Sequence, residues 1–272
     1  MTVPAGAQRW LFRVDSYRRP GEEIRTSEYD VGVLEDDATA KAFVLEHHYS
    51  GSYPAARARM GLFHRGELAG VAVFSHPCAD KVLTNVFHAP AASAVELGRF
   101  VLLDRVPHNG ETWFLGRAFE LLRARGDLVG VLSFSDPMPR SNGAGRLVFP
   151  GHVGTIYQAH NGRYLGRGTA RTLRLLPNGA VFSSRAASKI RAGERGWAYS
   201  VALLVEHGAP SPSCLRSGVA DPEELRAWLP RALAAVTRTT RHPGNHKYAW
   251  AFSRRSRAVL PIGTGYPKKE DV

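Results

Sequence analysis

The chain has 272 residues, of which 44% are hydrophobic and 22% are charged, the composition of a globular protein with a core. This excludes intrinsic disorder over most of the chain, and no apolar run approaches the roughly 18 residues of a membrane span. The first ten residues contain no apolar stretch of the kind that a secretory signal needs, so we expect a cytoplasmic protein with no membrane partner. Cys78 and Cys214 lie too far apart in the sequence to indicate a disulfide framework or a four-thiolate zinc site.

The charge of the chain is strongly asymmetric. In total, 36 Lys and Arg residues stand against 24 Asp and Glu residues, which gives a formal net charge of +12. Residues 1–136 contain 15 basic and 17 acidic side chains, whereas residues 137–272 contain 21 basic and seven acidic ones. A GC-rich coding bias explains why Arg outnumbers Lys, but it does not explain the scarcity of acids after residue 136. The second half therefore predicts a polyanionic partner, most often a nucleic acid.

The first half of the chain predicts alternating helices and strands. An acid at Asp36 precedes a helical stretch, Gly66-Glu67 separates two apolar runs as in a β-hairpin, and Gly126 is suited to cap a helix C-terminus. In chain order the predicted elements are an arm or edge strand at 1–35, a helix at 40–47, strands at 60–65 and 68–75, a strand at 95–103 and a helix at 111–125.

The second half begins with a continuous apolar run that is typical of a buried strand, followed by a loop rich in Pro, Gly and Arg. Asp221 and Pro222 are favourable residues for the start of a helix. In chain order we expect a strand at 129–134, a loop at 137–151, a helix or helix–turn at 155–165, a hairpin of 172–176 and 181–183, a helix at 222–236, and then a turn and a strand. The pattern favours a mixed α/β sheet over a helical bundle or a β-sandwich.

A polar loop follows the first predicted helix and carries His48, Tyr49 and Ser50 in succession. These residues offer a general base, a phenol and a hydroxyl. A histidine at a helix C-terminus is also explained by the helix dipole alone, so a structural interpretation stays open.

Two charged residues are associated with predicted apolar strands. Arg99 needs a partner if it is buried, either an anionic ligand or Glu96 in a structural ion pair. Glu96 would lie on the opposite face of a regular strand, unless Gly98 introduces a bulge. Asp136 ends a buried strand, where it could act as a base, although Asp before Pro also forms turns. Because ligands collect at the carboxyl ends of strands in open α/β sheets, Arg99 and Asp136 are expected to share one crevice.

Two further polar clusters admit a functional and a structural interpretation. Residues 109–112 precede a helix, whose first N–H groups can bind an anion or can simply be capped. The other cluster combines amides that can pair with adenine edges and tyrosines that can stack on an extruded base, although such tyrosines also build cores. Its members are Tyr157, Gln158, Asn161 and Tyr164.

The histidines do not form a complete zinc or iron ligand set in the sequence, so we predict no metal site. A hydroxyl-activating triad is not indicated either, because the chain has no G-x-S-x-G motif.

Six motifs, in order along the chain, resemble those of the Mom-type DNA modification proteins of bacteriophages. They are HHYSGS at 47–52, GELAGVAVF at 66–74, ELGRFVL at 96–102, NGET at 109–112, LSFSD at 132–136 and GTIYQAHNGRYLG at 154–166. That family looks like a divergent branch of the GNAT acyltransferase fold. The resemblance implies a GNAT-like mixed central sheet flanked by helices, with an arm at 1–35, a catalytic core at 36–176 and a basic extension at 177–272.

The resemblance also implies an activity. It indicates a transferase that converts adenine in double-stranded DNA to an N6-carbamoylmethyl (glycinamide-type) derivative that resists restriction, in the host cytoplasm if a phage encodes the protein. The implied catalytic residues are His48, Tyr49, Arg99, Thr112, Asp136 and Tyr157. The implied substrate-binding residues are Ser50, Asn109, Ser133, Gln158, Asn161 and Tyr164. Thr112 stands at a Ser position of the family, and the stretch from Asp136 to Tyr157 is longer than usual in it.

The donor implied by the resemblance is acetyl-CoA or another activated donor, with a loosely bound iron left open. The segment DRVPHNGETWFLGRA lacks the Q/R-x-x-G-x-G/A pattern on which conventional acetyltransferases bind the CoA pyrophosphate. Two alternatives to the leading hypothesis remain. A CoA-dependent N-acyltransferase of a small amine or protein would turn over acetyl-CoA without DNA, whereas a non-catalytic DNA-binding protein would bind DNA salt-sensitively and leave it chemically unchanged.

Overall fold

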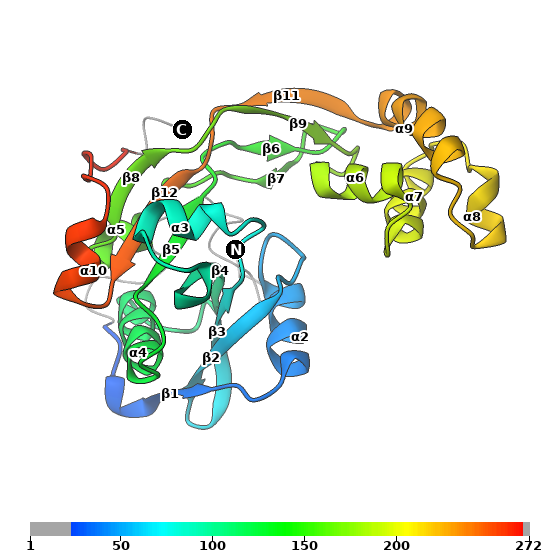
Figure 1. The fold of residues 1–272 in the computed structure, drawn as a ribbon. Coiled ribbons are helices and arrows are strands. Elements are labelled where there is room, and N and C mark those ends of the chain that lie inside the picture. The colour runs from blue at the N-terminus through cyan, green and yellow to red at the C-terminus, as the bar shows by residue number, and fades with distance from the viewer. Residues whose placement is uncertain (1–22, 269–272) are drawn as a thin grey trace. The chain divides into compact units, whose positions relative to one another are not determined.

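The computed structural model describes residues 23–268, and the chain divides into two compact units (Figure 1). Unit 1 contains residues 1–138, 149–168 and 245–272, and unit 2 contains residues 139–148 and 169–244. This division differs from the boundary expected at residues 176 and 177, because the chain returns to the sheet of unit 1 after residue 244. The predicted arm at 1–35 lies in part outside the described residues; its last part forms the edge strand of that sheet.

Unit 1 is built on a seven-stranded mixed sheet, in the order β1-β2-β3-β4-β5-β12-β8. Its strands are β1 (Tyr29–Val33), β2 (Ala56–His64), β3 (Glu67–Ser75), β4 (Ala94–Leu102), β5 (Gly130–Ser135), β8 (Arg163–Arg167) and β12 (His246–Ala251). Only β4 and β5 pair in parallel, and every other neighbouring pair is antiparallel. The helices are η1 (Thr26–Glu28), α2 (Asp37–His47), α3 (Lys81–Phe87), η2 (Ala91–Ser93), α4 (Gly110–Ala124), α5 (Thr155–Ala159) and α10 (Arg254–Val259). The predicted mixed α/β sheet flanked by helices is confirmed.

Helices cover both faces of this sheet because its strands are apolar on both sides. On β3, Ala72 and Phe74 pack in one cluster with α4, whereas Val71 and Val73 pack in another with α2. Successive side chains of a strand point to opposite faces, so α4 and α2 lie on opposite sides of the sheet. Burial on both faces explains why these strands read as nearly continuous apolar runs.

Local signals in the sequence set several element boundaries. Asp36 caps α2, with its carboxylate accepting a hydrogen bond from the backbone N–H of Thr39 at 2.8 Å. Arg65 and Gly66 both have positive φ, as the two-residue turn between β2 and β3 requires. The helix α4 provides the crossover between the parallel strands β4 and β5.

Unit 2 combines a small sheet with four helices. The three-stranded sheet has the order β10-β9-β11, and a separate two-stranded sheet pairs β6 with β7. The elements are β6 (Arg140–Ser141), β7 (Leu147–Phe149), β9 (Arg171–Leu175), β10 (Val181–Phe182), α6 (Ser184–Ala192), α7 (Trp197–Glu206), α8 (Ser213–Ser217), α9 (Pro222–Val236) and β11 (Arg238–His242); the last residue of β7 belongs to unit 1. Its core is separate from that of unit 1 and is formed by α6, α7, α8 and α9, with Phe182 of β10. A core of its own is what defines a structural domain.

Two predicted segments differ from the structure. The helix expected at 155–165 ends at residue 159, and the rest of it forms β8, because residues 163–164 pair with β12. The loop expected at 137–151 contains the paired strands β6 and β7. None of the helices within residues 23–268 combines the length and apolar character needed to cross a bilayer.

Candidate functional site

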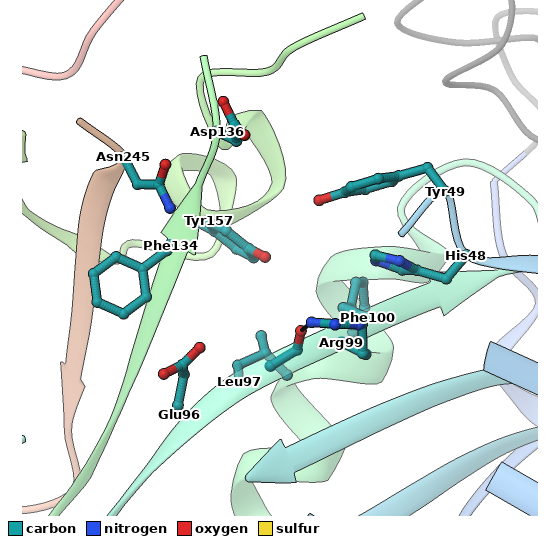
Figure 2. Close-up of a pocket in the computed structure, with 11 residues that line it drawn as sticks. His48, Tyr49, Glu96, Leu97, Arg99, Phe100, Phe134, Asp136, Tyr157 and Asn245 are labelled. Atoms are coloured by element: carbon teal, nitrogen blue, oxygen red, sulfur yellow. Dashed lines mark hydrogen bonds between the residues drawn. The ribbon is translucent and has the colours of Figure 1, made fainter. Parts of the chain in front are cut away.

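A pocket of about 180 Å³ opens where β4 and β5 separate. The two strands pair in parallel only as far as Leu97 and Ser133, and the pocket lies beyond this point, at their carboxyl ends. All of its lining residues belong to unit 1. They are His48, Tyr49, Glu96, Leu97, Gly98, Arg99, Phe100, Phe134, Asp136, Tyr157 and Asn245 (Figure 2).

A β-bulge at Gly98 places Glu96 and Arg99 on the same pocket. In the pairing of β3 with β4, Val73 lies opposite Arg99 and Phe74 lies opposite Leu97, so Gly98 is the extra residue. A Cβ atom at Gly98 would lie 2.5 Å from the Oγ of Ser75, too close for any side chain. Glycine at this position therefore permits the close approach of β3, and the bulge realigns the side chains that follow.

Arg99 fixes the polar loop after α2. Its Nε donates to the backbone oxygen of Ser52 at 2.8 Å, and its Nη2 donates to the Ser52 hydroxyl at 2.8 Å. Of the two alternatives for a partner of Arg99, the structural ion pair with Glu96 is not formed. The guanidinium is bound to the loop that carries His48 and Tyr49, and it also contributes positive charge to the pocket.

Burial shifts the ionisation of several groups in and beside the pocket. Burial raises the pKa of Glu96 to about 7, although the nearby Arg99 charge opposes the shift. Burial lowers the pKa of His48 to about 3, with Arg99 and His152 adding to the effect. Burial also lowers the pKa of His152 to about 4, against the opposing charge of Asp136. These shifts favour the neutral form of both histidines at neutral pH, and they bring the pKa of Glu96 close to neutrality.

Two tyrosines enter the pocket from opposite sides, with their hydroxyl groups directed toward one another (Figure 2). Tyr49 packs on Phe149 with a ring-centroid distance of 4.7 Å, and its hydroxyl lies 3.5 Å from Nε2 of His152. Tyr157 comes from α5, and burial raises the pKa of its phenol. Tyr49 also packs on the ring of His48, and Tyr157 packs on Tyr248 and Trp250, so the aromatic neighbours hold both rings in place.

The structure brings together five of the six residues implied as catalytic: His48, Tyr49, Arg99, Asp136 and Tyr157. Thr112 does not line the pocket; its hydroxyl donates to the backbone oxygen of Asn109 at the start of α4.

None of the six residues implied as substrate-binding lines the pocket. Ser50 lies beside it, 2.9 Å from the ring of His48, and the hydroxyl of the buried Ser133 donates to the backbone of Leu97. The amide of Gln158 donates to Val153, Tyr248 and Pro267, and the Tyr164 hydroxyl lies 2.8 Å from Nδ1 of His246. The remaining two, Asn109 and Asn161, are exposed residues with positive φ at a helix start and a turn.

Sequence reasoning did not select Glu96, Phe134, His152 or Asn245 as site residues. For Glu96 the sequence did offer a signal, because Gly98 allows a bulge that places Glu96 and Arg99 on the same pocket. His152 directly follows the loop predicted at 137–151, and Asn245 precedes a strand that joins the sheet from far along the chain. No local pattern marks either position.

The start of α4 does not fit the pyrophosphate of coenzyme A. The N–H of Gly110 donates to Pro107, and a Cβ atom there would lie 2.5 Å from Val106, so the glycine serves packing. Glu111 adds an acid to the first helical turn, where a bound anion would be repelled. Within the described residues no group of three or more His, Cys, Asp or Glu side chains is placed to hold a metal, so the iron left open above has no ligand set there.

Comparisons with solved structures gave matches to two GNAT proteins. Among solved structures, a GNAT-family acetyltransferase from Streptococcus pneumoniae is 16% identical, with a TM-score of 0.33 over 53% of this chain and 89% of that one. A tandem GNAT protein from the clavulanic acid biosynthesis pathway is 9% identical, with a TM-score of 0.42 over 83% of this chain and 99% of that one. No curated protein matches the chain in sequence.

The Mom protein family matches residues 31–209, which is more than half of the chain. The match includes every pocket residue except Asn245, and it continues through α7 of unit 2. The chain therefore belongs to the Mom protein family.

Proposed function

We propose that the protein is a transferase that modifies the N6 amine of adenine in double-stranded DNA with a carbamoylmethyl group. The observation that carries this proposal is the pocket of Figure 2, where two tyrosines, two carboxyl groups and a guanidinium meet at the end of splayed strands in a Mom-family chain. Its volume of about 180 Å³ is smaller than the roughly 300–1,000 Å³ of sites for drug-sized ligands, which favours a single ring system.

The base would have to leave the helical stack to reach this pocket. Enzymes that act on a base within a duplex extrude it and hold it by stacking and by hydrogen bonds to its edge. Tyr49 and Tyr157 would form hydrogen bonds to the edge of the base, because their hydroxyl groups approach the same space from opposite sides.

The chemistry needs a proton acceptor near N6. The lone pair of an adenine amine is delocalised into the ring, so the amine is a weak nucleophile until it loses a proton. In the proposed reaction a bond forms between N6 and the methylene carbon of the transferred group, the bond from that carbon to the leaving group of the donor breaks, and one N6 proton passes to Asp136. General base catalysis of this kind contributes roughly 10²–10⁴-fold in rate.

Glu96 would act as the general acid that protonates the leaving group of the donor. Its raised pKa of about 7 keeps much of it protonated at neutral pH, so it can protonate the departing group. Arg99 provides the positive charge that holds an anionic part of the donor. The step requires an activated donor with a leaving group on the carbon next to its carboxamide. Acetyl-CoA has none at its methyl carbon, and the start of α4 does not fit a pyrophosphate, so the proposed reaction uses another activated donor.

Restriction protection in cells tests the proposal. Plasmid DNA from cells that express the wild-type chain is expected to resist nucleases whose sites contain adenine, whereas plasmid from cells with Asp136→Asn is expected to be cut. Asp30→Asn, an exposed change on β1, serves as the matched control and is expected to protect fully. Complete digestion with soluble wild-type protein present would contradict the proposal and favour acyl transfer to another amine, which is assayed by acetyl-CoA turnover without DNA.

A further inference from the structure

The positive charge of the chain is concentrated in unit 2, which contributes no residue to the pocket. Unit 2 contains 13 Lys and Arg residues and five Asp and Glu residues, a net charge of +8 out of the total of +12. The acids there are largely engaged in the helical part: Asp221 caps α9, Glu224 accepts hydrogen bonds from Ser213 and Cys214, and Glu194 pairs with Arg185. The strands β9 and β11 of the small sheet contain no acidic residue.

In the three-stranded sheet of unit 2, the antiparallel strands β9 and β11 pair over five residues, whereas β10 pairs only with Arg174 and Leu175 of β9. The pair β9 and β11, here called the ribbon, has a basic, hydroxyl-bearing face. Arg174 lies directly opposite Thr239, and Thr172 lies directly opposite Arg241, so all four share one face. These four side chains are exposed, whereas Leu173, between two of them, is buried. The backbones of Arg174 and Arg241 pair within the sheet, whereas neither guanidinium forms a hydrogen bond or an ion pair within the described part of the chain. Both guanidinium groups are therefore available to a ligand of opposite charge.

The shape of the ribbon indicates which polyanion it fits. Figure 1 shows β9 and β11 running side by side, with the helices of unit 2 at one end. The major groove of B-form DNA, about 12 Å wide, admits a two-stranded β-ribbon. Arginine contacts phosphates or the O6 and N7 atoms of guanine, and threonine contacts phosphates or the methyl group of thymine. The ribbon presents these two residue types and no acid.

We propose that the exposed face formed by Thr172, Arg174, Thr239 and Arg241, the ribbon face, docks in the major groove of duplex DNA. This inference rests on the proposed function for its partner, because the adenine in question lies in double-stranded DNA. It assigns unit 2 the role of holding the duplex, while unit 1 carries the chemistry. It also explains why the pocket itself needs few basic residues.

Binding of the full chain to a fluorescein-labelled DNA duplex, measured by anisotropy from about 50 to 200 mM salt, tests the ribbon face. The double variant Arg174→Ala/Arg241→Ala is expected to bind roughly 10- to 100-fold more weakly and to lower the salt slope by about 2. The control Arg216→Ala/Arg231→Ala removes the same charge from exposed positions of α8 and α9 and is expected to leave the slope unchanged. Thermal unfolding of each variant establishes that it is folded, and Arg174→Lys/Arg241→Lys is expected to restore the slope.

Several outcomes would contradict the proposal that the ribbon face binds DNA. These are a wild-type chain that does not bind duplex DNA, equal losses in the two double-alanine variants, or an unchanged slope in Arg174→Ala/Arg241→Ala. Equal binding of double-stranded RNA would also overturn it, because the major groove of A-form RNA is too deep and narrow to admit a ribbon. Ribbon-dependent DNA binding without adenine modification would contradict the proposed function alone. Modification that is lost in Asp136→Asn but unaffected in the ribbon variant would contradict the ribbon face alone.

Discussion

Glu96 and Arg99 line the same pocket although they lie three residues apart on one β-strand, positions that point to opposite faces of a regular strand. The extra residue Gly98 reverses the alternation between them. The pocket thereby gains a buried carboxyl group and a guanidinium that do not pair with each other. Arg99 is held instead by the oxygens of Ser52.

Substitution of Gly98 tests whether the bulge organises the site. Gly98→Ala is expected to destabilise the protein by about 1–3 kcal/mol and to abolish transfer, because the new Cβ would lie 2.5 Å from the Ser75 Oγ. Ser75→Ala removes that oxygen, so the double variant is expected to regain much of the lost stability. Denaturant unfolding measures both effects.

A helical glycine provides the control for this prediction. At Gly116 a Cβ atom would make an ordinary contact of 3.5 Å with His160, so Gly116→Ala is expected to be neutral or stabilising. A neutral Gly98→Ala variant with full activity would show that the bulge tolerates a side chain and has no role in the site.

The raised pKa of Glu96 predicts a stability that depends on pH. A carboxyl group whose pKa rises from 4.5 unfolded to about 7 folded binds its proton more tightly in the native state. The contribution of Glu96 to the free energy of unfolding is therefore fully present below pH 4.5 and is lost as the pH rises through about 7. Glu96→Gln is expected to be more stable than wild type at pH 8, by on the order of 2 kcal/mol, and not at pH 4. Thermal unfolding of both proteins at the two pH values measures this difference. Equal stabilities of wild type and Glu96→Gln at pH 8 would show that folding does not raise the pKa of Glu96.

The same residue predicts the shape of the activity profile. If protonated Glu96 assists the leaving group, transfer by the wild type falls as the pH rises through about 7. Glu96→Gln is expected to be slower and to lack this fall, since glutamine does not titrate. A Gln variant that keeps the descending limb would assign the limb to another group.

The two half-buried histidines His48 and His152 predict sensitivity to acid. Burial lowers the pKa of His48 to about 3 and that of His152 to about 4, so each must stay neutral in the folded state. Their contribution to stability is present above pH 6.5 and is lost as the pH falls toward these values. His152→Gln is expected to weaken the loss of stability between pH 6.5 and 4, as measured by denaturant midpoints. An exposed control, His108→Gln, is expected to keep the acid sensitivity of wild type.

Much of unit 1 follows from local patterns in the sequence. The helices at 37–47 and 110–124, the hairpin at 56–75 and the strands at 94–102 and 130–135 begin and end within a few residues of the predicted bounds. These segments combine a clear period with capping or turn residues, as Asp36 and Gly66 illustrate. The mixed sheet follows from their order.

Long-range features could not be read in this way. The strand β12 joins the sheet between β5 and β8 from more than a hundred residues away, and it brings Asn245 to the pocket. His152 reaches Tyr49 from a position between the loop predicted at 137–151 and the helix predicted from 155, where no pattern indicates a contact. Gln158 and Tyr164, which suggested base recognition, are used by internal hydrogen bonds, because burial of polar groups requires partners that a sequence does not reveal.

Nucleoside mass spectrometry of plasmid DNA co-expressed with the protein tests the central claim most directly. We expect a new deoxyadenosine species that is about 57 Da heavier, the net gain when a carbamoylmethyl group replaces one hydrogen, and that is absent with Asp136→Asn. Unmodified deoxyadenosine in the presence of soluble, folded wild-type protein would contradict it.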